Sequence, residues 1–318
     1  MKKILLTLLA TVFTITSYTQ TSSIITILDS DITQGKKLIT AYFTPMTESF
    51  SANLNNGWYN TAKPHNLGGF DLTFTINTVI IPNSAKTYKI EDEFGGVFTS
   101  EEEKAYTIFG NSQTTEITYQ NSYSGLSETF DMPGGYELPI LPLPMIQAGI
   151  GLIKNTAVDV RFIPKLGIGN EINVNLLGFG IKHDLLQWIP AFGDAIPMSL
   201  SLQAGHTSLN TELEISNQNI SLTTKATTIN LIASKKLSIL TGYAGIGYNS
   251  SATTFAANAN FNFDNVGFEE AVEIKFASDK NVRANVGLRL NITLITIQAD
   301  YTFSEYPTAT LGLGISFR

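Results

Sequence analysis

The sequence predicts an all-β fold: a transmembrane antiparallel up-and-down β-barrel of about 12 to 14 strands with an N-terminal helical hatch segment. Residues 281–318 give the clearest pattern, because apolar side chains alternate there with polar or small ones through three consecutive runs. Such alternation with short breaks is typical of an antiparallel meander. The polar face of these runs carries Arg283, Arg289, Gln298 and Asp300. We interpret this face as a wet lumen wall and the apolar face as lipid-facing.

The composition agrees with a lipid-facing exterior. Hydrophobic residues make up 43% of the 318 residues and charged residues only 15%, against roughly 25% charged in soluble domains. Beyond the N-terminal segment no apolar run reaches the roughly 20 residues of a membrane helix. Since only helices and closed barrels satisfy every backbone group in lipid, an integral protein of this kind must be a barrel. A soluble exported β-sandwich would show the same alternation and is the alternative fold.

Residues 1–19 have the features of a secretory signal peptide, with Lys2 and Lys3 ahead of an apolar core. We expect cleavage before Gln20, which removes two lysines and takes the net charge from −7 to −9. An acidic exported chain is a poor nucleic-acid binder. The absence of cysteine excludes disulfides, thiol catalysis and cysteine metal sites. The expected location is the bacterial outer membrane, with its lipid as the surrounding partner.

Residues 20–66 are predicted to form the hatch. Residues 29–42 begin with side chains that suit a helix N-cap and continue with apolar residues at helical spacing. Pro45 is expected to interrupt this helix, and a second short helix should follow it. A partly polar helical segment ahead of a barrel fits inside the lumen. An ordinary periplasmic tail is the alternative.

Residues 67–318 are assigned to the barrel. The expected strands are residues 70–82, 145–153, 156–164, 171–181, 198–209, 222–233, 237–248, 252–263, 268–277 and the three runs of 281–318. Residues 83–143 are irregular and acidic, and we expect an extracellular excursion there. A small hairpin of residues 106–109 and 114–119 would raise the barrel count from about 12 to 14. Residues 182–197 are expected to contain a short amphipathic helix at the membrane interface.

The sequence carries no catalytic, cofactor or metal motif. The three histidines, His65, His183 and His206, are too scattered for a metal site, and no Gly-x-Ser-x-Gly elbow is present. Glycine pairs such as Gly245-x-Gly247 lack the context of a dinucleotide fingerprint; glycine in a barrel strand more often marks a bend or a close approach of the backbone. The acidic runs, such as residues 101–103, are either divalent-cation ligands or a solvated loop. We expect a protein that is not an enzyme and has no cofactor.

Residues 53–65 are the densest group of distinctive side chains. The candidate hatch residues are Asn53, Asn55, Asn56, Trp58, Tyr59, Asn60 and His65. Asparagine and glycine adopt left-handed turns readily, and tryptophan and tyrosine combine an apolar face with one polar tip. Inside a barrel such a segment can plug the lumen while it hydrogen-bonds the wall. A cap over the periplasmic opening is the alternative.

Three strings carry a family resemblance. They are NNGWYNTAKPH at residues 55–65 followed by LGGFD at 67–71, LPMIQ at 143–147, and DVRFIP at 159–164. With them the chain resembles a Bacteroidetes-type outer-membrane β-barrel family of unknown function. A helical hatch ahead of a barrel is also distantly similar to the long-chain fatty-acid transporter family, although the Asn-Pro-Ala motif typical of that family is absent.

Three functions follow as hypotheses. The leading one is an outer-membrane channel or transporter for small hydrophobic molecules, gated by the hatch. The alternative is a non-transporting scaffold barrel of a surface complex, which would have a lumen packed shut and no continuous apolar pocket. A barrel lipid hydrolase would need a serine and a histidine within hydrogen-bond reach near the outer leaflet. The oligomeric state is not predicted.

Overall fold

The computed structural model describes residues 32–90, 96–120, 127–168, 172–189, 197–215, 218–263 and 266–317. The predicted signal peptide and the beginning of the hatch lie outside the described residues. The chain divides into two compact units. One contains Phe50–Val79 and Pro142–Arg318, and the other contains Ala10–Ser49 and Ile80–Leu141. We call them the barrel unit and the insert unit.

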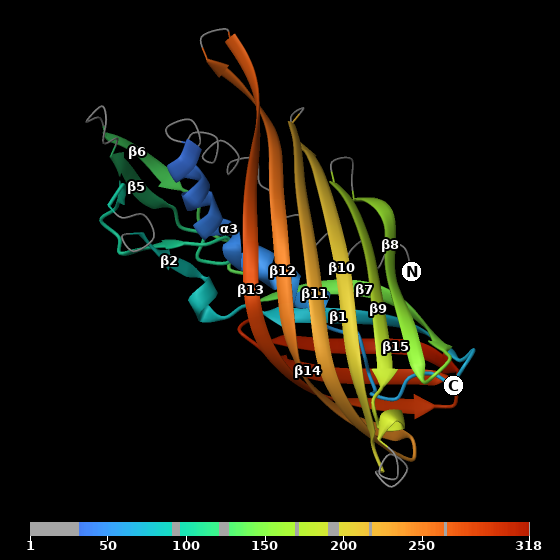
Figure 1. Cartoon of the computed structure of the whole chain (residues 1–318). Coiled ribbons are helices and arrows are strands. Elements are labelled where there is room, and N and C mark those ends of the chain that lie inside the picture. Colours follow the sequence, from blue (N-terminus) through green and yellow to red (C-terminus); the bar gives the residue numbers. More distant parts are fainter. Residues whose placement is uncertain are drawn as a thin grey trace. The chain divides into compact units, whose positions relative to one another are not determined.

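Ten antiparallel strands of the described chain close into a barrel in the order β1-β15-β14-β13-β12-β11-β10-β9-β8-β7 (Figure 1). Their bounds are β1 Phe70–Ile80, β7 Ile140–Leu152, β8 Thr156–Ile168, β9 Ile172–Asp184, β10 Ser199–Ile215, β11 Gln218–Leu237, β12 Leu240–Phe263, β13 Val266–Ile292, β14 Ile295–Phe303 and β15 Thr308–Phe317. The last strand pairs with the first, and Phe70 lies opposite Phe317. The predicted up-and-down barrel that closes on its C-terminal strand is therefore confirmed.

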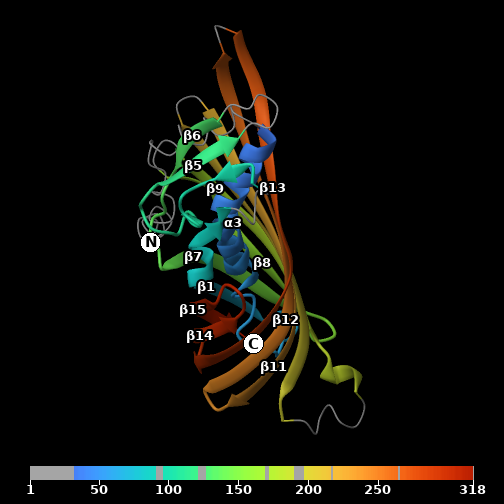
Figure 2. The same ribbon diagram turned by 90° about the vertical axis from the view of Figure 1, so that its left-hand side faces the viewer.

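The predicted count of 12 to 14 strands is too high. Turns were expected near residues 249–251 and 278–281, but β12 and β13 run through both places as strands of 24 and 27 residues. They stay paired on both sides of a β-bulge between Asn249 and Ser251. The polar residues there resemble turns in the sequence. In the structure they lie within two continuously paired strands, where a bulge takes up the extra residue. Figure 2 shows β12 and β13 running well beyond β14 and β15.

Tight turns join the strands at the barrel end where Phe70 and Phe317 meet. Positive φ angles occur at Lys154, Asn155, Ser238 and Thr293, as tight hairpin loops require. The loops at Ser238 and Thr293 have two residues, and the loop that contains Lys154 and Asn155 has three. The predicted turn at Lys154 and Asn155 is confirmed. The turn between β11 and β12 lies at Ser238 rather than at the predicted residues 234–236, because Leu237 still pairs with Leu240.

The two faces of the barrel wall differ in polarity as predicted. Large apolar side chains point outward, with exposed fractions of 74% for Val282, 64% for Leu311 and 57% for Phe303. Alternate positions such as Thr302 and Thr310 face the lumen and are buried. An apolar exterior around a polar interior is the organisation of a barrel that spans a membrane. Among the described residues, no helix is both long and apolar enough to cross a bilayer.

The hatch region contains a single helix, α3, which spans Ile32–Asn55 with Pro45 inside it. The prediction of two short helices separated by Pro45 is therefore wrong. Proline removes one helical N–H donor, but nearby hydroxyls donate to helix carbonyls: Ser49 Oγ to Pro45 O at 2.7 Å and Thr44 Oγ1 to Thr40 O at 2.7 Å. The helix nevertheless continues to Asn55.

The insert unit is a folded body within the predicted excursion. Its elements are η1 Asn83–Ala85, β2 Thr87–Lys89, β3 Phe98–Thr99, β4 Lys104–Tyr106, β5 Thr115–Gln120 and β6 Ser127–Met132. They form a two-stranded sheet, β2-β4, and a three-stranded sheet, β3-β5-β6. The predicted hairpin of residues 106–109 and 114–119 is wrong, because β5 pairs with β3 and β6. Tyr42 of α3 donates its hydroxyl to Gly134 O at 2.8 Å within this unit.

The predicted interfacial helix is only one 3-10 turn, η2, at Leu186–Trp188. It follows directly after β9, and residues 190–196 lie outside the described part of the chain. Trp188 is 62% exposed, as suits an aromatic side chain at the level of lipid headgroups.

Candidate functional site: a plug inside the barrel

Residues 50–66, which we call the plug, lie inside the barrel. They include the last turn and a half of α3 and the loop that leads to β1. Hydrogen bonds reach the plug from β1, β7, β8, β9, β10, β11, β13 and β14, eight of the ten barrel strands. A segment that is bonded from so many strands of one closed barrel occupies its lumen.

Two arginines of the wall bind the C-terminal end of α3. A helix leaves its last carbonyls without helical partners, and here Arg161 donates to Leu54 O at 2.9 Å and to Asn56 O at 2.7 Å. Arg283 donates to Asn55 O at 2.6 Å and to Asn56 Oδ1 at 2.5 Å. Cations at this end also interact favourably with the helix dipole. Both arginines are almost completely buried.

A wall asparagine completes the binding of the helix end. Asn77 Nδ2 donates to Asn53 O at 2.8 Å and to Asn56 O at 3.0 Å. The chain then turns at Gly57, where φ is 73°. A Cβ at this position would lie 2.8 Å from Asn77 Oδ1, so both the backbone angle and the close wall require glycine.

Trp58 packs its indole flat against the wall. The Arg161 guanidinium carbon lies 3.7 Å from the ring centroid, a cation–π contact. On the wall, a Cβ at Gly180 or Gly205 would lie 2.7 Å or 2.4 Å from the indole ring. The absence of a side chain at these two strand positions therefore creates the space for Trp58. Gln147 Nε2 donates to the Trp58 carbonyl at 3.2 Å.

Tyr59 also packs against a wall position that has no side chain. Its hydroxyl donates to Asn285 Oδ1 at 2.7 Å, and its ring meets Tyr243 edge-on at 6.2 Å between centroids. Burial raises the pKa of Tyr59 to about 12, so the hydroxyl acts as a neutral donor. A Cβ at Gly245 would lie 2.5 Å from the Tyr59 hydroxyl oxygen. The sequence predicts a bend or a close approach of backbone for such a glycine, whereas here a tyrosine side chain takes the space.

Neutral side chains hold the next part of the plug. Asn60 Nδ2 donates to Gln298 Oε1. The Ala62 N–H donates to Ser234 Oγ at 2.9 Å, and Ser201 Oγ donates to Ala62 O at 2.5 Å. These contacts use hydroxyl and amide groups rather than guanidinium groups.

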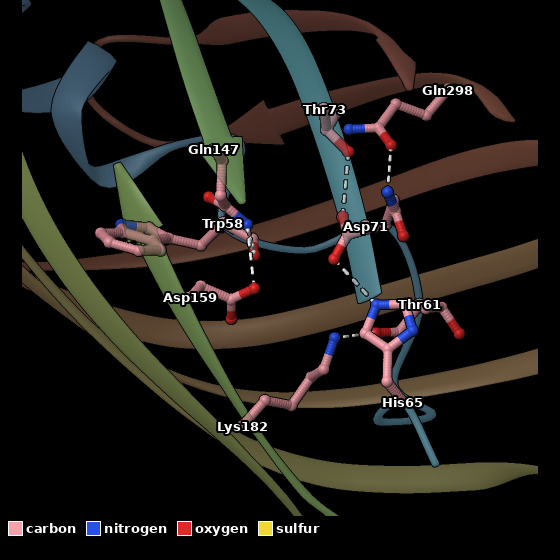
Figure 3. Close-up of polar contacts among 10 residues, drawn as sticks. Trp58, Thr61, His65, Asp71, Thr73, Gln147, Asp159, Lys182 and Gln298 are labelled. Atoms are coloured by element: carbon pink, nitrogen blue, oxygen red, sulfur yellow. Dashed lines mark hydrogen bonds and ion pairs between the residues drawn. The ribbon is translucent and has the colours of Figure 1, made fainter. Parts of the chain in front are cut away.

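An imidazole–carboxylate pair fixes the plug where it joins the barrel (Figure 3). His65 Nε2 lies 2.8 Å from Asp71 Oδ1, near the start of β1, and Thr73 donates its hydroxyl to Asp71 Oδ2 at 3.0 Å. Lys182 extends from β9 toward the same region and lies 3.4 Å from Thr61 O. The plug therefore has a polar anchor at each of its ends.

The free space between plug and wall is small and polar. Side chains that line it include Asn60, His65, Asp71, Gln147, Asp159 and Lys182. It has room for about one water molecule.

Every candidate hatch residue lies in the plug, but the wall candidates differ in what they do. Arg283 and Gln298 hydrogen-bond the plug. Arg289 is buried on the lumen side, 3% exposed. Asp300 accepts a hydrogen bond from Tyr243 at 2.9 Å. In the described part of the chain, neither Arg289 nor Asp300 hydrogen-bonds the plug.

Several plug-binding residues were missed in the sequence. They are Asn77, Arg161, Lys182, Ser201 and Ser234, with Gly180 and Gly205 as the glycines that receive Trp58. The signal was parity: each occupies the inward position of a strand with apolar outward neighbours. Parity shows that a residue faces the lumen, but it does not show which residue contacts the plug, because that depends on the shear of the closed barrel.

His183 and His206 hydrogen-bond other side chains. His183 shares hydrogen bonds with Thr156 at 2.8 Å and with Trp188 at 2.8 Å, and His206 pairs with Thr227 at 2.8 Å. Among the described residues there is no group of three side chains that could hold a metal ion.

Comparisons with known proteins add a family. A model described as a family of unknown function, DUF6588, matches residues 1–317. No curated protein matches the chain. Solved structures similar to it include the translocator domain of the autotransporter NalP from Neisseria meningitidis, with 11% identity, coverage of 88% of this chain and 97% of that chain, and a TM-score of 0.31.

Two further solved structures are also similar to the chain. The outer membrane protease OmpT from Escherichia coli has 11% identity, coverage of 82% and 99%, and a TM-score of 0.31. The Ralstonia pickettii toluene transporter TbuX has 7% identity, coverage of 84% and 94%, and a TM-score of 0.26. At these TM-scores the likenesses carry no argument, so fold and function rest on the geometry of the chain itself.

Proposed function

The chain belongs to the family of unknown function DUF6588, and we propose that it is an outer-membrane channel closed by its own plug. The observation that carries the proposal is a wall shaped to receive a separate segment. Gly180, Gly205 and Gly245 leave space where Trp58 and Tyr59 pack. A barrel that served only as a support could fill its lumen with side chains of its own wall.

The chemistry of the contacts supports a plug that can leave. Many contacts between plug and wall are hydrogen bonds, which water can replace when the plug moves, although Trp58, Tyr59 and Ala62 also pack with Ile232 and Tyr243 of the wall. Each neutral bond therefore contributes only about 0.5–1.5 kcal/mol net. If a large apolar interface held the plug, its release would expose that apolar surface to water, at a free-energy cost of about 25 cal/mol per Å². The polar interface makes opening accessible without unfolding of the barrel.

The nature of the cargo follows from the lining. The sequence predicts small hydrophobic molecules, but the described lumen beside the plug is lined by amides, hydroxyls and charged groups. This lining favours small polar solutes for a path along the barrel axis. Hydrophobic cargo stays a prediction that the described lining does not support.

The alternative is a non-transporting barrel that scaffolds a surface complex. One observation favours it: the space beside the plug holds only about one water molecule. The insert unit, a folded body between β1 and β7, would then supply the surface that a partner recognises.

Solute release from liposomes separates the two functions. Liposomes with the protein without residues 20–66 should release a small sugar much faster than liposomes with the intact protein. The same deletion should increase the release rate of a small aromatic hydrocarbon by less. Heat-modifiable migration on gels would verify that the barrel has formed. Equal release of both solutes by the folded deletion variant and the intact protein would contradict the channel.

A further inference from the structure

Arg161 and Arg283 are buried cations of the wall that each donate two hydrogen bonds to the plug. Between them they donate to Leu54 O, Asn55 O, Asn56 O and Asn56 Oδ1. These four acceptor oxygens come from three consecutive residues. Within the described chain, no carboxylate lies within 4.0 Å of either guanidinium. Their positive charges therefore face carbonyl dipoles rather than full negative charges.

Without the plug, the wall offers these two arginines few hydrogen-bond acceptors. Arg161 has Gln147 Oε1 at 2.9 Å and Arg283 has Thr302 Oγ1 at 3.0 Å as wall acceptors. Arg283 Nε has no hydrogen-bond partner even with the plug in place. When the plug leaves, four N–H···O bonds lose their acceptors at once. A buried guanidinium without acceptors is costly, so in the open lumen water or a solute has to supply acceptor oxygens here.

Two acids of the wall lie near the arginines. Asp159 accepts from Gln147 at 3.3 Å through Oδ1, and its buried Oδ2 has no hydrogen-bond partner. Asp300 accepts from Tyr243 at 2.9 Å. The largely buried charged side chains of the described wall include four cations, Arg161, Lys182, Arg283 and Arg289, against three acids, Asp71, Asp159 and Asp300, although the whole chain is at −7.

We propose that Arg161 and Arg283 form a binding site for small carboxylate solutes in the open channel, where the solute takes the place of the α3 carbonyl oxygens. This proposal rests on the proposed function and names its substrate class. A guanidinium binds a carboxylate through two parallel N–H···O bonds. The plug thus closes the channel by occupying the site with its own backbone oxygens, in competition with the solute.

The test is ion selectivity of single channels in planar bilayers. Two opened forms are compared: the protein without residues 20–66, and the full-length double variant W58A/Y59A, which keeps α3 and the insert unit. In a KCl gradient both should be anion-selective, and potassium acetate should reduce the chloride current. Adding R161Q and R283Q should lower the chloride-to-potassium permeability ratio several-fold and abolish the effect of acetate.

Matched control variants distinguish the loss of the arginine site from the loss of positive charge alone. Lys235 and Lys236 lie exposed near the β11–β12 turn, so K235Q/K236Q removes the same charge away from the arginines and should keep both anion selectivity and the acetate effect. R161K/R283K should stay anion-selective but respond less to acetate, because lysine lacks the two-pronged donor.

The two proposals fail in different ways. Folded barrels of both opened forms that conduct no ions would contradict the channel. Conducting barrels without anion preference, or with selectivity and acetate response unchanged by R161Q/R283Q, would overturn the carboxylate site and leave the channel standing. If the deletion variant does not fold, W58A/Y59A decides between these outcomes.

Discussion

The two ends of the plug are held by different chemistry. At the helix end, two buried guanidinium groups bind backbone carbonyls of residues 54–56. In the later part, residues 60–62 are held mainly by serine hydroxyls and an amide, and the charged donor Lys182 reaches Thr61 O only at 3.4 Å. Hydrogen bonds of charged donors contribute about 1.5–3 kcal/mol, against about 1 kcal/mol for neutral ones. We therefore expect opening to begin in the later part while the helix end stays bound longest.

The largest expected effect is at the helix end. Arg161→Ala removes three hydrogen bonds and the contact with Trp58. It should lower the free energy of unfolding by about 3 kcal/mol or more, measured by urea titration in detergent micelles. Arg161→Lys should lower the free energy of unfolding by less, because lysine keeps the positive charge. A loss below about 1 kcal/mol for the alanine variant would mean that the helix end is not the stronger anchor.

A smaller effect is expected between the two ends, where Trp58 lies. Gly205→Ala places a Cβ 2.4 Å from the indole ring and should cost about 1–3 kcal/mol through overpacking. Gly242→Ala is the matched control, because its nearest neighbour is 3.9 Å away. In a Trp188→Phe background, Trp58 fluorescence should shift to the red in the Gly205 variant only. Unchanged emission would show that the indole does not depend on this space.

The smallest effect is expected in the later part. Ser234→Ala removes the acceptor of the Ala62 N–H and should cost about 1 kcal/mol. Hydrogen exchange by mass spectrometry should become faster in peptides that cover residues 60–66, whereas peptides from residues 50–56 should be unchanged. Equal acceleration in both sets would show that the plug moves as one body, against the proposed difference between its ends.

The sequence predicts much of the barrel because side-chain parity is local. Each strand shows its own apolar face, so the meander, its closure near Phe317 and the polar lumen follow directly. The strand count failed where polar residues in long strands resemble turns, as at Asn249 and Ser251. Only pairing with a distant partner distinguishes a bulge from a turn, and that information is absent from a single strand.

The plug shows the same limit. Its distinctive residues, such as Trp58 and Tyr59, are visible in the sequence because asparagine, glycine and aromatic residues cluster there. Their partners are not visible. Arg161 and Asn56 are separated by 105 residues, and Gly205 looks like any other strand glycine until the closed barrel places it against the indole. Helix continuity through Pro45 was missed because proline in a sequence is a sign that a helix ends, whereas α3 continues through it.

The central claim is that the plug must move for solutes to pass, and a reversible crosslink tests it most directly. The natural chain has no cysteine, and Thr61 Oγ1 and Ser234 Oγ are 3.3 Å apart, so T61C/S234C places two thiols within reach of a disulfide. Solute release from liposomes is measured before and after reduction, with each single-cysteine variant as control. The account predicts no release while the disulfide is intact and release at the level of the single variants once it is reduced. Equal release in both states, or none in either, would contradict it.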